Sequence, residues 1–280
     1  MSISGTATAD ESTVAGHYDA LDRFYREIWG EHVHHGLWST GRESPAQATR
    51  AMIDLVAEAA RLPPQARVID VGCGYGGTSR VLAAEHGCDV TGFTLSAAQA
   101  AWARAQGGTP RFEVRSWLEN ELPDGEADAV VAIESLSHMV DKPLAFSQAA
   151  RVLKAGGRFV LVDWFASEAP NAAERRLLLA PIAREGRLPT LCSVSEYERM
   201  LGRAGFRVER TQDFRPLAPH RTWGIVARRL ARRLATDAQA RRFLLGPENP
   251  DRAFALSLAR IPLALRTGTL RLVMIAAERS

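Results

Sequence analysis

Short apolar runs alternate with amphipathic helical segments through the middle of the chain, and this alternation restricts the possible folds more than any other feature. The spacing predicts helices over residues 78–86, 97–105 and 144–153. The predicted strands between them are 67–71, 89–93, 111–114, 127–133 and 157–163. Strand–helix–strand units in repetition form a parallel sheet whose two faces are covered by helices.

The flanking segments are helical at the start and mixed at the end. A polar leader extends to about Thr13, and helical patterns follow over 17–36 and 44–60. After residue 163 we expect a helix over 195–204, capped by Ser195 with Glu198 three residues on. Two more strands, 207–210 and 270–276, are separated by a long arginine-rich helical insertion. The strands then number seven, and residues 1–280 form a single domain.

Composition and charge fit a globular protein without a special partner. The chain has 280 residues, 46% of them hydrophobic, which is enough for a full core. A net charge of +3 gives no reason to expect a nucleic-acid partner. We interpret the densest basic cluster as a solvated helix face rather than a phosphate-binding site. It comprises Arg228, Arg229, Arg232, Arg233, Arg241 and Arg242.

Cysteine usage and hydropathy indicate the compartment. Cys73, Cys88 and Cys192 form an odd set without a CxxC pair, which argues against disulfides and against a thiolate zinc site. The chain starts with no signal-peptide pattern and contains no apolar stretch long enough to cross a membrane. We expect a cytoplasmic protein without a membrane partner, and a homodimer remains open.

The sharpest local feature is Val68–Gly77, a buried strand that runs into a glycine-rich turn opening a helix. Such a turn places a ligand against backbone amides at a helix N-terminus. Gly72, Gly74 and Gly77 fit the GxGxxG fingerprint of dinucleotide-binding dehydrogenases. That interpretation needs an acid at the end of the next strand, whereas Asp89 lies at its beginning. The sequence therefore lacks the acidic residue that the dinucleotide-binding interpretation requires.

With Asp70 placed before Gly72, Gly74 and Gly76, the loop resembles the first motif of class I S-adenosylmethionine-dependent methyltransferases. Residues 92–99 (GFTLSAAQ) resemble the GxTLSxxQ stretch of tocopherol and sterol C-methyltransferases and of bacterial sugar O-methyltransferases. Tyr18 with residues 29–36 resembles the N-terminal cap of that group, and residues 133–139 resemble its motif after the fourth strand. The likeness covers about residues 15–215 and 268–280.

The resemblance implies a Rossmann-like, doubly wound α/β fold with a mostly parallel seven-stranded sheet. An N-terminal helical cap would occupy about 14–62, the core about 64–215 plus 268–280, and a helical lid about 216–267 before the last strand. S-adenosyl-L-methionine would be the cofactor. Its expected ligands are Tyr18, Asp70, Gly72, Gly74, Gly76, Thr94, Leu95, Gln99, Ser116, Trp117 and Glu134.

One position departs from the family pattern. Many relatives place an Asp-Ala pair after the third strand to hold the adenine amino group, where this chain has Ser116-Trp117. Serine can still accept a hydrogen bond, and the indole can lie against the adenine face.

Two residues follow neighbouring strands at the edge where this fold builds its site. His138 is the candidate general base, and Asp163 would orient it or bind the acceptor hydroxyl. Candidate substrate-pocket residues are Trp29, His34, Trp164 and Trp223. His32, His34 and His35 lack supporting carboxylates or thiolates, so no metal site is predicted.

The sequence thus predicts an S-adenosylmethionine-dependent methyltransferase acting on a small-molecule acceptor, with O-methylation in antibiotic or other natural-product biosynthesis as the first choice. C-methylation of an electron-rich carbon is the alternative, and N-methylation stays possible. A hypothesis of another class is a non-methylating cyclase or binding protein on the same fold. A dehydrogenase is the third.

Overall fold

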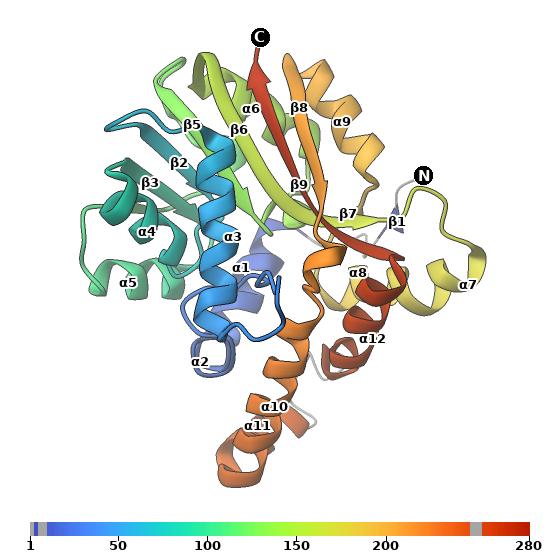
Figure 1. The fold of residues 1–280 in the computed structure, drawn as a ribbon. Helices are drawn as coiled ribbons and strands as arrows, with labels where there is room; N and C mark the ends of the chain where they lie inside the picture. Colours follow the sequence, from blue (N-terminus) through green and yellow to red (C-terminus); the bar gives the residue numbers. More distant parts are fainter. Residues whose placement is uncertain (1–2, 5–9, 247–253) are drawn as a thin grey trace.

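The computed structural model describes residues 3–4, 10–246 and 254–280, and a seven-stranded sheet runs through its centre (Figure 1). In spatial order the strands are β4 (Arg111–Val114), β3 (Asp89–Thr94), β2 (Arg67–Val71), β5 (Ala127–Ile133), β6 (Leu153–Ala166), β9 (Leu270–Arg279) and β8 (Phe206–Asp213). The first five are mutually parallel, and β9 is antiparallel to both of its neighbours. The predicted Rossmann-like, mostly parallel seven-stranded fold is confirmed.

Helices cover the two faces of the sheet, as Figure 1 shows. One apolar cluster joins the sheet to residues from α3, α4, α8 and α12, and a second joins it to residues from α6 and α9. A further helix, α5, lies beside β4 at the sheet edge. The bounds are α3 (Pro45–Ala60), α4 (Gly77–His86), α5 (Ala97–Ala105), α6 (Lys142–Val152), α8 (Ala180–Glu185) and α9 (Val194–Arg203).

Strand β6 is longer than the predicted 157–163 and is buried on both faces. Successive side chains of a strand point to opposite faces. Val160 and Val162 accordingly belong to the α3 side, whereas Leu161 and Phe165 belong to the α6 and α9 side. This alternation determines which side chains of β6 reach the candidate site.

Capping boxes fix the starts of two helices. Ser44 and Gln47 exchange side-chain and backbone hydrogen bonds at the start of α3, where Pro45 occupies the first turn as expected. The capping prediction for α9 was wrong by two residues, because Ser193 and Glu196 form the box there. Ser193 with Glu196 and Ser195 with Glu198 have the same spacing, so the sequence pattern alone does not show which pair forms the capping box.

The N-terminal segment is more ordered than expected. Ile3–Ser4 (β1) pairs with Thr190–Leu191 (β7), and Asp10 caps α1 (Glu11–Ala20), so the leader does not extend to Thr13. Helical structure continues through α2 (Asp22–Phe24) and the π-helix η1 (Tyr25–Trp29), then stops short of the predicted residue 36. These three helices and the following loop to residue 44 are called the cap below. The predicted cap also included α3, which instead lies on the sheet.

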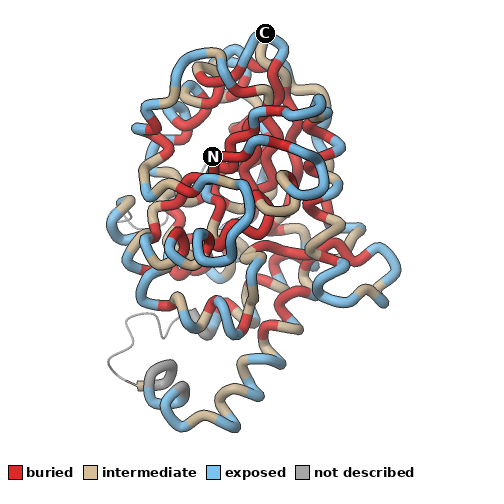
Figure 2. The backbone as a smooth tube through the Cα atoms, turned by 90° about the vertical axis from the view of Figure 1, so that its left-hand side faces the viewer, coloured by how far each residue is buried: buried red, intermediate tan, exposed pale blue. Residues whose placement is uncertain are grey.

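The insertion before the last strand is helical, and Trp223 of its first long helix and Ile261 of its last helix both join the apolar cluster on the α3 side of the sheet. It comprises η5 (Arg215–Leu217), α10 (Arg221–Thr236), α11 (Ala238–Leu245) and α12 (Phe254–Thr267). Only the first turns of α10 are buried, and α11 extends away from the body (Figures 1 and 2). Among the described helices, none is long and apolar enough to cross a membrane. The remaining short elements are α7 (Ala172–Glu174) and η4 (Arg175–Leu179).

We expect Gly36→Ala to destabilise the protein by about 1–3 kcal/mol, because a new Cβ would lie 2.6 Å from Ala48 Cβ and 3.0 Å from its carbonyl carbon. Gly16 in α1 has no atom within 4 Å of the same position, so Gly16→Ala should stabilise by about 0.5–1 kcal/mol. Urea unfolding of both variants measures the difference. Equal stabilities would refute the close approach of the cap to α3.

Candidate active site

The loop between β2 and α4 has a backbone that favours glycine at three positions. Gly72, Gly74 and Gly76 have φ angles of +75°, +55° and +75°. The amides of Gly72 and Cys73 both donate to the carbonyl of Phe93, each at 2.9 Å, which ties the loop to the end of β3. A Cβ at Gly74 would meet nothing within 4 Å, so the loop faces open space there.

Asp70 is the penultimate residue of β2, beneath this loop, and is buried. Ser79 donates to its Oδ2 at 2.6 Å. Burial raises the pKa of Asp70 to about 6, against the lowering effect of the Ser79 hydrogen bond. A ligand that brings positive charge to this carboxyl therefore relieves a desolvation cost.

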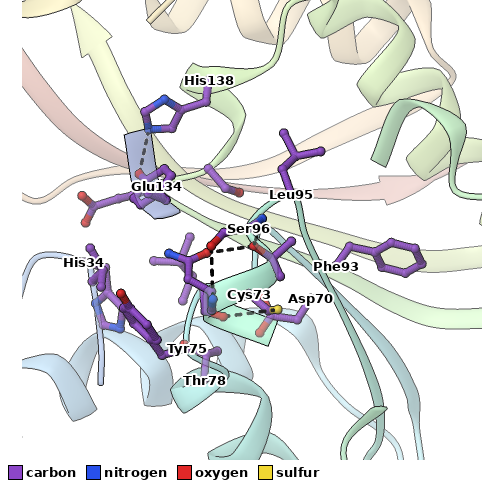
Figure 3. Close-up of a pocket in the computed structure, with 18 of the residues that line it drawn as sticks. His34, Asp70, Cys73, Tyr75, Thr78, Phe93, Leu95, Ser96, Glu134 and His138 are labelled. Atoms are coloured by element: carbon purple, nitrogen blue, oxygen red, sulfur yellow. Dashed lines mark hydrogen bonds between the residues drawn. The ribbon is translucent and has the colours of Figure 1, made fainter. Parts of the chain in front are cut away.

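A cavity opens above the loop and is called the glycine-loop cavity (Figure 3). It brings together most of the predicted cofactor residues, namely Tyr18, Asp70, Gly72, Gly74, Thr94, Leu95, Gln99, Trp117 and Glu134. Figure 3 shows His138 toward one end, Asp70 and Thr78 toward the other, and Glu134 between them. Thr94 and Gln99 bond to each other, from Oγ1 to Oε1 at 2.8 Å.

Two predicted cofactor residues do not line this cavity. Ser116 donates its hydroxyl to Glu11 of α1 at 2.6 Å and accepts from the Leu118 amide, so it caps η2 (Trp117–Glu119). Gly76 lies against the ring of Phe112. The adenine contact expected of Ser116 is therefore not formed by the observed side chain, whereas Trp117 does reach the cavity.

His34 also faces the glycine-loop cavity rather than the substrate pocket where the sequence placed it. Its Nδ1 lies 2.9 Å from the carbonyl oxygen of His35; since a carbonyl only accepts, Nδ1 carries the proton. The buried Nε2 then presents a lone pair without a hydrogen-bond partner, and so does one nitrogen of the adjacent His32. Burial lowers the pKa of both imidazoles, that of His32 to about 4, so both are neutral acceptors.

A second, more apolar cavity adjoins the first and is called the tryptophan cavity. Trp29, Trp164 and Trp223 line it, as predicted for the substrate pocket, together with Tyr25 and Leu188. The two cavities share four lining residues, which are Tyr18, Val33, Glu134 and His138. A molecule in one cavity therefore meets a molecule in the other at these side chains.

The Glu134 carboxylate holds the walls of the tryptophan cavity together. It accepts from the His35 amide at 2.6 Å, from His35 Nδ1 at 2.7 Å and from Trp164 Nε1 at 2.8 Å. Trp223 Nε1 donates to His35 Nε2 at 2.7 Å, which makes His35 the neutral Nδ1–H tautomer. Burial acts to raise the pKa of Glu134, but its interactions with His35 outweigh burial and the pKa is lowered. Glu134 is therefore an ionised carboxylate.

Tyr18 and His138 meet where the two cavities join. The Tyr18 hydroxyl lies 3.2 Å from His138 Nε2, and His138 Nδ1 lies 3.4 Å from the carbonyl of Arg187. Because the carbonyl requires a proton on Nδ1, Nε2 accepts from Tyr18. Burial, and then the nearby His17, lowers the pKa of His138 to about 4. Burial, and then Glu134, raises the pKa of Tyr18. At neutral pH the pair is a neutral imidazole and a neutral phenol.

The predicted partnership of His138 with Asp163 was wrong. Asp163 is fully buried, lines neither cavity and accepts from the Tyr197 hydroxyl at 2.8 Å on the α9 side of the sheet. The next residue of β6, Trp164, points into the tryptophan cavity, so the alternation of the strand turns Asp163 away. Asp163 is a structural carboxyl, and Tyr18 takes the place beside His138.

His35 belongs to the site although the sequence gives it no role beyond a histidine cluster. One of its ring nitrogens is bonded to Glu134 and the other to Trp223. Among the residues with described positions, no three His, Cys, Asp or Glu side chains could hold a metal ion together. The contact of His35 with Trp223 spans 188 positions, and no local pattern signals it.

Comparison with known proteins decides the family. A profile of the methyltransferase domain matches residues 45–211, which is more than half of the chain. The chain belongs to the class I S-adenosylmethionine-dependent methyltransferase family. It resembles the tocopherol methyltransferase group within that family, and S-adenosylmethionine is the family's cofactor.

Two relatives and one solved structure illustrate the likeness. A probable chloroplastic tocopherol O-methyltransferase of Oryza sativa subsp. japonica is 37% identical over 221 residues, 72% of this chain and 61% of that protein. The match thus spans less than two thirds of the plant relative. The 27-O-demethylrifamycin SV methyltransferase of Amycolatopsis mediterranei is 32% identical over 70% of this chain and 74% of its own. The [4+2]-cyclase SpnF shares the fold, with a TM-score of 0.81, 24% identity and coverage of 100% and 99%.

The residues of the glycine-loop cavity fit the family's cofactor. The Asp70 carboxyl and the unpartnered nitrogens of His32 and His34 are hydrogen-bond acceptors that suit an ammonium group. Phe93, Leu95 and Trp117 supply apolar and aromatic faces that suit a purine ring. The side chains of this cavity therefore agree with the assignment of the chain to the methyltransferase family.

The raised pKa of Asp163, about 6 because of burial, predicts a pH-dependent contribution to stability. The folded state holds this proton more tightly than the unfolded state, so stability falls as pH rises from about 4 to about 6 and then levels off. We expect Asp163→Asn to reduce this pH-dependent loss in the free energy of unfolding by about 2–3 kcal/mol. Urea unfolding from pH 4.5 to 7.5 measures it. A variant with the wild-type pH dependence would show that another group is responsible.

Proposed function

We propose that this protein transfers a methyl group from S-adenosylmethionine to a hydroxyl oxygen of a small, partly apolar acceptor. The observation that carries the proposal is the Tyr18–His138 pair at the junction of the two cavities. The oxygen-methylating names of the rice and Amycolatopsis relatives support it, and the latter supports a role in antibiotic biosynthesis. The odd number of cysteines, all three of them free, fits a cytoplasmic setting.

The glycine-loop cavity is the proposed cofactor site. When bound, S-adenosylmethionine supplies an electrophilic methyl group on a sulfonium sulfur. Asp70 and His34 would accept hydrogen bonds from its ammonium group, with Thr94 and Gln99 as further polar residues and Trp117 against the adenine. Binding there orients one reactant before the acceptor arrives, which lowers the entropic cost of the reaction.

The tryptophan cavity is the proposed acceptor site. Its three indoles and Leu188 provide an apolar wall, and the Glu134 network fixes two of the indoles. An acceptor with an aromatic or terpenoid body would bury apolar surface here and displace water from the junction. The acceptor hydroxyl would then meet Tyr18 and His138, two of the three polar side chains shared by the two cavities.

The proton of the acceptor hydroxyl would reach His138 through Tyr18. It passes to the Tyr18 oxygen while the phenolic proton of Tyr18 passes to His138 Nε2. His138 becomes an imidazolium whose Nδ1–H still donates to the Arg187 carbonyl. Tyr18 is neutral before and after the transfer, so it acts as a relay, and His138 is the base.

Glu134 supports one alternative, C-methylation of an electron-rich carbon. Its ionised carboxylate lines both cavities and would stabilise positive charge that develops on such an acceptor. This alternative needs no base during methyl transfer. It therefore predicts that the Tyr18 hydroxyl contributes little to the rate.

His34→Asn tests the cofactor assignment. Asparagine keeps a donor where His34 Nδ1 bonds to the His35 carbonyl but removes the lone pair of Nε2. Loss of a hydrogen bond to a charged group should weaken S-adenosylmethionine binding by about 10–100-fold in calorimetric titration. His34→Gln, which restores an acceptor near the Nε2 position, should recover part of the affinity. Unchanged affinity in His34→Asn would remove His34 from the cofactor site.

Tyr18→Phe and His138→Asn test the reaction type. In O-methylation each variant should lower kcat by about 10²–10⁴-fold, because the proton acceptor or its relay is lost. The assay measures S-adenosylhomocysteine release and methylated product with a panel of phenols and glycosides. Because the pKa of His138 is about 4, the wild-type rate should not fall between pH 8 and pH 6.

Three outcomes decide against the proposal. Near-normal rates in both variants would favour C-methylation. Cofactor binding without any S-adenosylhomocysteine release would favour a repurposed fold, such as a cyclase or binding protein. A wild-type rate that falls tenfold per pH unit below pH 7 would contradict a base that is already neutral.

A further inference from the structure

A groove separate from both cavities runs between α10, α12 and the loop of residues 38–45. Its lining contains five arginines, His220 and one carboxylate; the arginines are Arg42, Arg221, Arg228, Arg229 and Arg266. Trp223 lines this groove as well as the tryptophan cavity, so α10 separates the two. In Figure 1, α10 and α12 lie beside each other below the sheet. Arg228 and Arg229 belong to the basic cluster that the sequence predicted to be a solvated helix face, but both line this groove.

Among the described residues, the arginines of the groove form no ion pair with an acidic side chain. Arg50 on α3, for comparison, pairs with Asp54 and Glu85. In the described part of the chain, the guanidinium groups of Arg42, Arg228 and Arg266 make no hydrogen bond or ion pair. They come from three different elements, are exposed, and converge on one groove. This convergence gathers positive charge that is not paired with any carboxylate among the described residues.

The one carboxylate of the groove does not neutralise them. Glu43 accepts from the Thr40 amide at 2.7 Å and from its hydroxyl at 3.0 Å through the same oxygen. Burial, followed by the charges of Arg266 and Arg221, lowers the pKa of His220, which agrees with a concentration of positive charge here. Arg221 is held over the Trp38 ring, 5.8 Å from its centroid, and donates to the Gly41 carbonyl at 2.7 Å.

The groove also has an apolar part. Trp38, Ile225, Leu258 and Pro262 line it between the arginines. On α10, Arg221, Ile225 and Arg228 recur at spacings of four and three, so one helix face presents both charge and apolar surface. A ligand that satisfies this surface carries an anionic head and an apolar body.

We propose that this groove binds an organic phosphate, a phosphate monoester or diphosphate attached to an apolar group. Each guanidinium group can donate two parallel hydrogen bonds to phosphate oxygens. Several guanidinium groups without acidic partners therefore suit a doubly charged phosphate better than a singly charged carboxylate ligand. A long nucleic acid fits less well, because Arg241 on α11 donates to the carbonyls of Leu234 and Ala235 near the end of α10, and Arg233 pairs with Glu27 and Asp237. The site is separate from the proposed acceptor cavity, so its failure and that of methyl transfer are distinguishable.

The test is calorimetric titration of the whole protein with 1-naphthyl phosphate at low salt, in the presence of saturating S-adenosylhomocysteine. We expect binding at one site, weaker binding of inorganic phosphate, and affinity that falls as salt is added. The double variant Arg228→Gln/Arg266→Gln should lose at least about 10-fold in affinity. The matched control Arg232→Gln/Arg242→Gln removes two exposed charges of α10 and α11 outside the groove and should bind as wild type does.

Several results would overturn the proposal. One is the absence of any heat of binding when the wild-type protein is titrated to millimolar probe. Another is an equal loss of affinity in the two double variants, which would indicate general charge attraction. Loss of binding on adding S-adenosylhomocysteine would place the probe in the glycine-loop cavity. A DNA duplex that displaces the probe and binds both double variants equally weakly would indicate a nucleic-acid surface. All four arginines are exposed, and thermal melts verify that the variants fold.

Discussion

The buried carboxylate of Glu134 is the group on which the geometry of the active site depends. Its oxygens accept N–H groups from His35 in the cap and Trp164 in β6, and His35 accepts from Trp223 in α10. Removing one partner of a buried charge costs about 3–5 kcal/mol, because the remaining charge is left without compensation. The cap, the sheet and the insertion are therefore held in a single arrangement around one negative charge.

The backbone at Glu134 makes this arrangement possible. Its φ angle is +53°, a left-handed conformation that costs a non-glycine residue about 1 kcal/mol, and its amide donates to the Val162 carbonyl at 2.7 Å. The left-handed residue ends β5 and redirects the chain into the 3-10 helix η3 (Leu136–His138). Glu134 and His138 then line the same two cavities, whereas four residues of continued strand would separate them by about 13 Å.

The sequence predicts the sheet and the glycine-loop cavity well because their signals are local. Apolar runs mark the central strands, and Asp70 with the glycines marks the loop within a few residues. The pairing of His138 with Asp163 failed because proximity of strand ends does not determine side-chain direction. The structure shows that Trp164 rather than Asp163 faces the cavity, and a strand gives its two faces to alternate residues. An error of one residue therefore moved a proposed catalytic group to the other side of the sheet.

The walls of the tryptophan cavity could not be derived in the same way, since they come from three distant segments. Trp29 belongs to the cap, Trp164 to β6 and Trp223 to α10, whereas Asp70 to His138 is one continuous stretch that supplies most of the glycine-loop cavity. Substitutions in the cap or the insertion can thus alter the tryptophan cavity without touching the glycine loop. Because the two parts of the site come from different segments, likeness in residues 45–211 establishes the family, whereas under the proposed function the choice of acceptor depends on the three tryptophans and the Glu134 network that positions two of them.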